Sequence, residues 1–146
     1  MSNKFNFDKT LARVRQAKAQ LPNILAKQAE GFWSDNFRAQ CWEGSEWKVP
    51  QRRIPGTKAY KYPLTKGLSR RTKGTLIGTG ALRRAVSNSS RVRTPERVVW
   101  VVDLPYAAAH NYGKDGMPQR KFMGDHRDLR RKQLKTINDT IRKAWR

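Results

Sequence analysis

The sequence predicts an α+β fold with a long N-terminal helix, a small antiparallel sheet, a C-terminal helix and a long basic loop. Three observations lead to this prediction. Apolar residues recur at helical spacing at both ends of the chain, and a β-branched run lies between them. Helix, short strands and then helix is the order of an α+β domain. The 146 residues suit a single domain spanning 1–146.

The N-terminal stretch, residues 9 to about 40, is predicted to be helical. Asp8 is the expected N-cap, since its carboxylate can accept the free amides of a first turn. Pro22 removes one helical hydrogen bond, so we expect either a kink there or a second helix that begins at Pro22. The apolar residues that fall close to one face are Leu11, Val14, Leu21, Leu25 and Phe32.

The next stretch, about residues 44–73, is predicted to be irregular, because glycine and proline recur throughout it. An irregular segment of this length in a compact domain is usually functional or disordered. We expect a flexible basic arm that orders against a partner, with an ordinary disordered surface loop as the alternative. Its candidate partner contacts are Trp47, Lys48, Arg52, Arg53, Lys58, Lys61, Arg70 and Arg71.

Short elements are predicted through the middle of the chain. Thr79 suits the N-cap of a brief helix over 80–86. Residues 97–104 form the clearest strand, and its unbroken Val-Val-Trp-Val-Val run predicts a strand covered on both faces. Residues 106–112 are expected to form a short helix ended by Gly113.

The final segment, about residues 125–145, is predicted to be a helix. Asp125 or Asp128 can cap it, and basic residues near its end suit the helix dipole. Its apolar stripe consists of Leu129, Leu134, Ile137, Ile141 and Trp145.

Charge limits the kinds of partner. The chain has 32 Lys and Arg against 11 Asp and Glu, a net charge of +21. Between Glu46 and Glu96 there are thirteen Lys or Arg and no acid. Such a one-sided segment is expected to meet acidic proteins or polyanions. The single Cys41, the absence of a signal-peptide pattern and the lack of a long apolar run predict a soluble protein made in a reducing cytoplasm.

Catalytic and metal sites are not indicated. His110, His126 and Cys41 share no metal-ligand spacing, and no nucleophile or zinc-protease motif occurs. We expect no cofactor. Nucleic-acid binding is the main alternative, since the basic stretch is interleaved with Trp47, Tyr60 and Tyr62. A small nuclease is a weaker alternative.

Two segments indicate a particular family more specifically than the overall composition and charge do. Tyr106-Ala107-Ala108-Ala109-His110-Asn111-Tyr112-Gly113 is followed closely by Met117-Pro118-Gln119-Arg120-Lys121-Phe122-Met123-Gly124. Together with Thr79-Gly80-Ala81-Leu82-Arg83, the strand through Trp100 and the loop Trp47, their order resembles the virion morphogenesis family of tailed bacteriophages. The resemblance covers about residues 5–145, with Met123 in place of the usual Leu and Lys121 where a second proline is common.

The resemblance implies a non-enzymatic virion protein for head–tail joining or tail completion. It would be a homo-oligomer, commonly a hexameric ring, at the neck of the virion. Its partners would be connector and tail tube or terminator proteins, and it could contact packaged DNA. It would be assembled in the bacterial cytoplasm. From side-chain chemistry we further expect Arg120 and Phe122 to form an inter-subunit or fold-closing anchor, with Arg120 pairing a carboxylate and Phe122 filling a pocket. Tyr106 and His110 are expected to orient the turn before it, and residues 48–73 to form the partner-binding arm.

Overall fold

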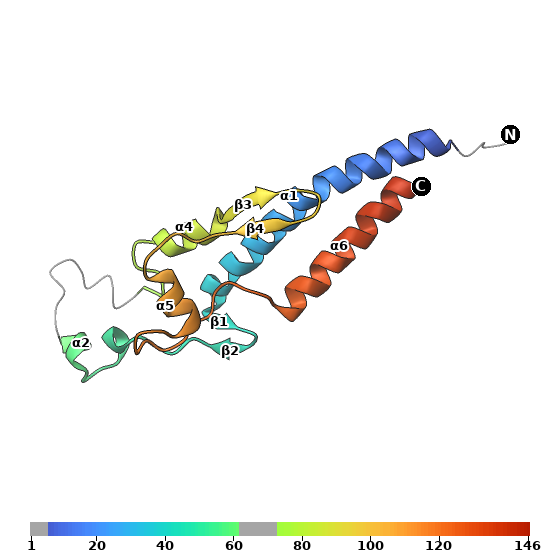
Figure 1. The fold of residues 1–146 in the computed structure, drawn as a ribbon. Coiled ribbons are helices and arrows are strands. Elements are labelled where there is room, and N and C mark those ends of the chain that lie inside the picture. The colour runs from blue at the N-terminus through green and yellow to red at the C-terminus, as the bar shows by residue number, and fades with distance from the viewer. Residues whose placement is uncertain (1–5, 62–72) are drawn as a thin grey trace. The chain divides into compact units, whose positions relative to one another are not determined.

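A computed structural model describes residues 6–61 and 73–146 and confirms the α+β class (Figure 1). Helices stand at both ends, with two small antiparallel sheets between them in sequence. The chain divides into two compact units. Unit 1 holds residues up to 30, 90–101 and 125–146, and unit 2 holds 31–89 and 102–124. The elements in order are α1 (Phe7–Ala39), β1 (Cys41–Trp42), β2 (Ser45–Glu46), η1 (Gln51–Arg53), α2 (Lys58–Lys61), α4 (Ala81–Ser87), β3 (Ser90–Arg93), β4 (Val98–Trp100), α5 (Ala107–Tyr112) and α6 (Arg127–Trp145).

Helix α1 runs unbroken for 33 residues, with Pro22 inside it. The alternative in which Pro22 begins a second helix is therefore wrong. Proline leaves the carbonyl of residue 18 without its helical donor, and Lys18 is exposed, so water can supply that hydrogen bond. The cap lies earlier than Asp8, because the Asn6 side-chain oxygen accepts from the Lys9 amide at 2.9 Å.

Unit 1 joins the first part of α1 to α6 and to the β3–β4 hairpin. The Gln28 amide donates to the Thr136 hydroxyl at 3.0 Å, which ties α6 to α1. The Glu30 carboxylate accepts from the Ser90 amide at 2.8 Å and so ties β3 to the same helix. His126, and not a neighbouring aspartate, caps α6, since its Nδ1 accepts from the Asp128 amide at 3.1 Å.

Strands β3 and β4 pair antiparallel with Ser90 opposite Trp100, and the register is irregular between Ser90 and Val92. The pairing ends at Trp100, so β4 is shorter than the strand predicted over 97–104. All three residues of β4 are half-buried, and Val101 is 44% exposed. The prediction of a strand covered on both faces is wrong for the described chain, since none of residues 98–102 is fully buried.

Unit 2 contains the end of α1, the β1–β2 hairpin, and the segments around α4 and α5. Its core is aromatic, with Phe37 and Phe122 almost fully buried and Trp33, Trp42 and Trp47 nearly so. Helix α4 follows Gly80 in a left-handed conformation (φ 78°), so Gly80, one residue after the expected Thr79, is the N-cap. Helix α5 ends at Gly113 (φ 69°), as predicted.

The predicted irregular stretch contains short elements: strand β2, the 3-10 turn η1 and helix α2. Trp47 is only 6% exposed, so this first part of the stretch packs against the unit. Residues 62–72, with the candidate contacts Arg70 and Arg71, lie outside the described residues.

Candidate functional site

Asn111 is the hub that joins the two sequence segments singled out above. It lies on α5 and is 6% exposed. Its Oδ1 accepts from the backbone amides of Phe122 (3.0 Å) and Met123 (3.2 Å), and its Nδ2 donates to the Met123 carbonyl at 3.1 Å. One buried side chain thus provides hydrogen-bond partners for three backbone groups of a segment that has no regular secondary structure.

Backbone contacts join the same two segments. The Arg120 amide donates to the His110 carbonyl at 2.8 Å. Gly113 sits so close to residue 119 that an added Cβ would meet the Gln119 backbone nitrogen at 3.1 Å. The left-handed φ of 69° also favours glycine there. Residues 106–113 and 118–124 therefore form one interlocked unit.

Three tryptophans also contact residues 121–124. We call them the tryptophan clamp (Trp33, Trp42 and Trp47). The Trp47 indole donates to the Lys121 carbonyl at 2.8 Å, and the Trp33 indole donates to the Gly124 carbonyl at 3.1 Å. The Lys121 ammonium lies 4.7 Å from the centre of the Trp42 ring, which is cation–π geometry. Lys121, which stands where the resembled family often has a second proline, thus contacts two tryptophans through its carbonyl and its ammonium group.

Phe122 and Arg120 both turn inward. Phe122 is 2% exposed, with its ring centre 5.6 Å from that of Phe37, which also meets Trp47 edge-on at 5.4 Å. The Arg120 Nε donates to the Lys48 carbonyl at 2.9 Å. Within the described residues no carboxylate pairs with Arg120, so its predicted acidic partner is not found inside the chain.

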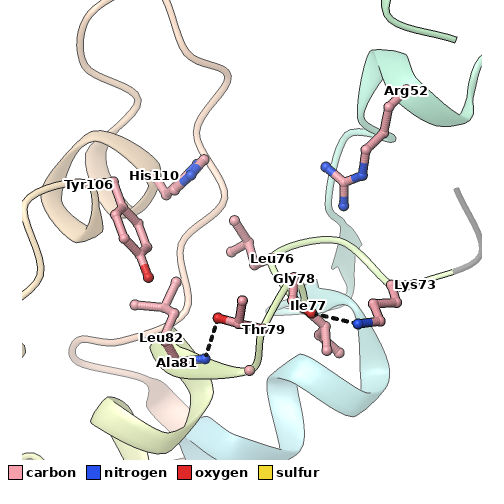
Figure 2. A pocket seen from close by; sticks show the side chains of 11 residues that line it. Arg52, Lys73, Leu76, Ile77, Gly78, Thr79, Ala81, Leu82, Tyr106 and His110 are labelled. Carbon is pink, nitrogen blue, oxygen red and sulfur yellow. Dashed lines mark hydrogen bonds between the residues drawn. The ribbon is translucent and has the colours of Figure 1, made fainter. Parts of the chain in front are cut away.

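Next to this cluster lies a pocket of about 290 Å³ in unit 2, which we call the basic pocket. Arg52 and Lys73 line it on one side, with Tyr106 and His110 of α5 on the other (Figure 2). The Lys73 ammonium donates to the Gly78 carbonyl at 3.0 Å. The remaining walls come from residues 76–82, which include Leu76, Ile77 and Leu82.

Gln40, the residue that follows α1, forms hydrogen bonds next to the wall of the basic pocket. The Gln40 carboxamide accepts from the Thr75 amide and donates to the Thr75 carbonyl. The same side chain donates to the Phe37 carbonyl at the end of the helix. An added Cβ at Gly74 would meet Gln40 atoms at 3.1 Å, so the chain passes close to this side chain.

The charged side chains that line the pocket, Arg52 and Lys73, are positive. Burial lowers the pKa of Arg120, and the nearby Arg52 guanidinium lowers it further. Burial also lowers the pKa of His110, with a smaller contribution from Arg120. The His110 Nδ1 atom is buried and has no hydrogen-bond partner among the described residues. No acidic residue lines the pocket within the described chain, so the region favours an anionic group.

The predicted contact residues separate into groups. Trp47, Lys48, Arg120 and Phe122 meet in the packed cluster, while Arg52, Tyr106 and His110 meet at the basic pocket. Arg53, Lys58 and Lys61 are exposed on η1 and α2 and join neither group.

Sequence reasoning missed Asn111, Gln40, Trp33 and Trp42. The only available signal for Asn111 was a polar residue on the inner side of a small, alanine-rich helix. The described residues contain no group of His, Cys, Asp and Glu side chains arranged to hold a metal ion. Among the described helices, none is long and apolar enough to cross a membrane.

Comparison with family models, curated proteins and solved structures gave no match for this chain.

Proposed function

We propose that this chain is a structural, non-enzymatic virion protein of a tailed bacteriophage. It acts in head–tail joining or tail completion as an oligomeric ring at the neck. The proposal starts from the order of the segments that resemble the virion morphogenesis family. One observation of the described residues supports it: the segments that carry the resemblance are the same ones that interlock through Asn111 and the tryptophan clamp.

This interlocking supports the proposal because the resembled residues depend on one another. Gly113 allows the close approach of Gln119, Asn111 holds Phe122, and Trp47 holds Lys121. If the weak motifs matched the family only by chance, there would be no reason to expect them to contact one another in the structure. The cluster is also tied together by hydrogen bonds beside the basic pocket, and a preformed surface loses little entropy on binding.

The test is removal of the gene from the phage or prophage that encodes it. Negative-stain images of the lysate are expected to show filled heads and complete tails that stay separate. Adding the purified protein is then expected to restore joined particles and plaques. Normal joined particles without the protein, or a gene that belongs to no phage or prophage, would contradict the proposal.

A matched pair of variants refines this test. Arg52→Glu reverses a charge at the basic pocket, and Arg15→Glu makes the same change on an exposed residue of α1 in unit 1. Head–tail joining is expected to fall with Arg52→Glu and to stay normal with Arg15→Glu. Equal head–tail joining by both variants would show that the basic pocket has no role in joining.

A basic nucleic-acid-binding protein is the second candidate, favoured by the acid-free stretch between Glu46 and Glu96. Such a protein binds duplex DNA with an affinity that falls steeply as salt rises. A steep salt slope in a DNA titration, together with unchanged head–tail joining after gene removal, would favour this candidate.

A further inference from the structure

The acidic residues of this chain are few, and all 11 lie within the described residues. Five of them, all on or beside α1 and α6, form ion pairs with close neighbours, as Asp139 does with Lys135 at 2.7 Å. Of the other six, Glu43 and Glu46 stand only three residues apart, on the β1–β2 hairpin (residues 41–46), which contains no Lys or Arg. Both are exposed, and within the described chain neither is in an ion pair. In a chain of net charge +21, this hairpin is a local acidic projection, which we call the acidic hairpin (residues 41–46).

The hairpin turn has a defined backbone conformation. Glu43 (φ 50°) and Gly44 (φ 79°) both have positive φ, as a two-residue turn of this twist requires. Asn, Asp or Gly is the usual residue at the first of these positions, yet here it is a glutamate. The strands on either side pair Cys41 with Glu46 and Trp42 with Ser45. Trp42 is buried, so it anchors the base of the hairpin in the core.

The basic pocket has the complementary chemistry. Arg52 and Lys73 supply positive charge, while Leu76, Leu82 and Tyr106 supply apolar walls. Its volume is about 290 Å³. A glutamate side chain has an apolar stem and an anionic end, and this mixed lining suits both parts.

Both features belong to unit 2, and they lie apart on it. The turn between β1 and β2 points away from η1 and α2, the side of the unit from which Arg52 comes (Figure 1). Two different, complementary patches on one rigid body give a heterologous contact. Repetition of that contact makes a closed ring or an open chain.

We infer that the basic pocket receives the acidic hairpin of a second copy of this chain, with Glu43 and Glu46 entering beside Arg52 and Lys73. This inference deepens the proposed function and rests on it for the expectation that the contact closes into a ring. The contact would also explain how copies of so basic a chain associate, because the general repulsion between them is overcome only where opposite charges meet.

The test is sedimentation velocity of the purified full chain over a range of concentrations at low and moderate salt. The wild type is expected to associate, and association is expected to weaken as salt rises. Glu43→Lys/Glu46→Lys (hairpin variant) and Arg52→Glu/Lys73→Glu (pocket variant) should each need roughly tenfold or more protein to associate. An equimolar mixture of the two should associate again. The basic hairpin of the hairpin variant can then bind the acidic pocket of the pocket variant, and the acidic hairpin of the pocket variant can bind the basic pocket of the hairpin variant.

Matched controls carry the same charge changes elsewhere. Glu96→Lys/Asp103→Lys alters two other exposed acids, and Arg15→Glu/Lys18→Glu alters two exposed bases of α1. Both controls should associate like the wild type, and circular dichroism melts should show that every variant is folded. The quadruple variant, with both surfaces reversed, should regain association even if the pocket variant alone is unstable.

Three results would overturn the inference. The first is a wild type that stays monomeric at every concentration and salt tested. The second is a hairpin variant that associates as well as the wild type. The third is a mixture that does not recover association while both variants are folded. Binding of a short DNA duplex that the pocket variant loses, with self-association unchanged, would instead assign the pocket to nucleic acid. If the chain associates through these surfaces but has no role in head–tail joining, the proposed function is wrong and the inferred contact between copies still stands.

Discussion

The side chain of Asn111 accepts a hydrogen bond from the backbone amide of Phe122 at 3.0 Å, one of several contacts that hold α5 against the following loop. The same oxygen accepts from the Met123 amide, and the side-chain nitrogen donates to the Met123 carbonyl. Because Asn111 and Phe122 are buried and Met123 is half-buried, the cost of losing this side chain is large compared with that of a surface hydrogen bond.

Asn111→Ala should therefore destabilise the protein strongly. Losing one side chain leaves two amides and one carbonyl of residues 122–123 without partners, and we expect a loss of at least about 2 kcal/mol in the free energy of unfolding. Urea titration followed by tryptophan fluorescence measures it. Asn88→Ala is the control, since the exposed Asn88 side chain makes one bond to the Arg84 carbonyl and should cost about 0.5 kcal/mol. Equal effects at the two sites would show that Asn111 is not a hub.

Three glycine-to-alanine changes separate conformational strain from close packing. Gly116→Ala meets nothing within 4 Å but has φ 73°, so it should cost about 1 kcal/mol from strain alone. Gly113→Ala adds contact with the Gln119 backbone at 3.1 Å and should cost clearly more. Gly31→Ala lies inside α1 in open space and should stabilise by about 0.5–1 kcal/mol. The midpoints of thermal unfolding should follow that order, and a Gly113 variant as stable as the Gly116 variant would contradict the close approach.

Phe122→Ala removes the most deeply buried side chain of the interlocked loop. Its ring contacts Phe37 with 5.6 Å between centres, so truncation leaves a cavity in the aromatic core. We expect a loss of about 3–5 kcal/mol in the free energy of unfolding. Phe7→Ala, at a ring that is 59% exposed, should change stability by no more than about 0.5 kcal/mol. A small effect at Phe122 would argue against a fixed position for residues 120–124.

Glu30 should make the stability of the protein depend on pH. Burial alone would raise the pKa of Glu30, but hydrogen bonds from Ser90 and Lys27 lower it on balance below its ordinary value. A carboxyl with a lowered folded-state pKa contributes stability above its unfolded pKa of about 4.3. That contribution is lost as the pH falls through the folded pKa.

The measurement is urea titration of the wild type and of Glu30→Gln between about pH 7 and pH 3, a range that spans the ordinary glutamate pKa of about 4.3. The variant should be less stable by about 1–2 kcal/mol near neutral pH, because glutamine cannot accept from the Lys27 ammonium with its amide nitrogen. The difference should shrink at the acidic end. A difference that stays constant with pH would show that the Glu30 charge does not contribute.

Local signals account for the parts of the fold that could be predicted. Apolar residues at helical spacing located α1 and α6, and Gly113 marked the end of α5. The caps were harder to predict, because several polar side chains stand near each helix start and only the backbone geometry selects among them. Asn6 and His126 accept the amide bonds that Asp8 and Asp125 or Asp128 were expected to accept.

The candidate site was predictable only in part. The residues of the resembled segments could be named, and the structure brings Tyr106 and His110 to the pocket and Arg120 and Phe122 to the core. The remaining contacts depend on pairings between distant parts of the chain, which spacing in sequence does not reveal. Gln40 reaches Thr75 across 35 positions, and Trp33 reaches Gly124 across 91.

The tryptophan clamp has a consequence for the order of folding during synthesis. Trp47 and Lys121 are separated by 74 residues and Trp33 and Gly124 by 91, so the first halves of these pairs are made long before the second. Until residue 124 has left the ribosome, the three indoles have neither the carbonyls nor the ammonium that they bind in the finished protein. Contacts of such high sequence separation form late and slowly, because a long loop must close before they form. The nascent chain can therefore build α1 early, but the aromatic core of unit 2 closes only after residue 124 has emerged.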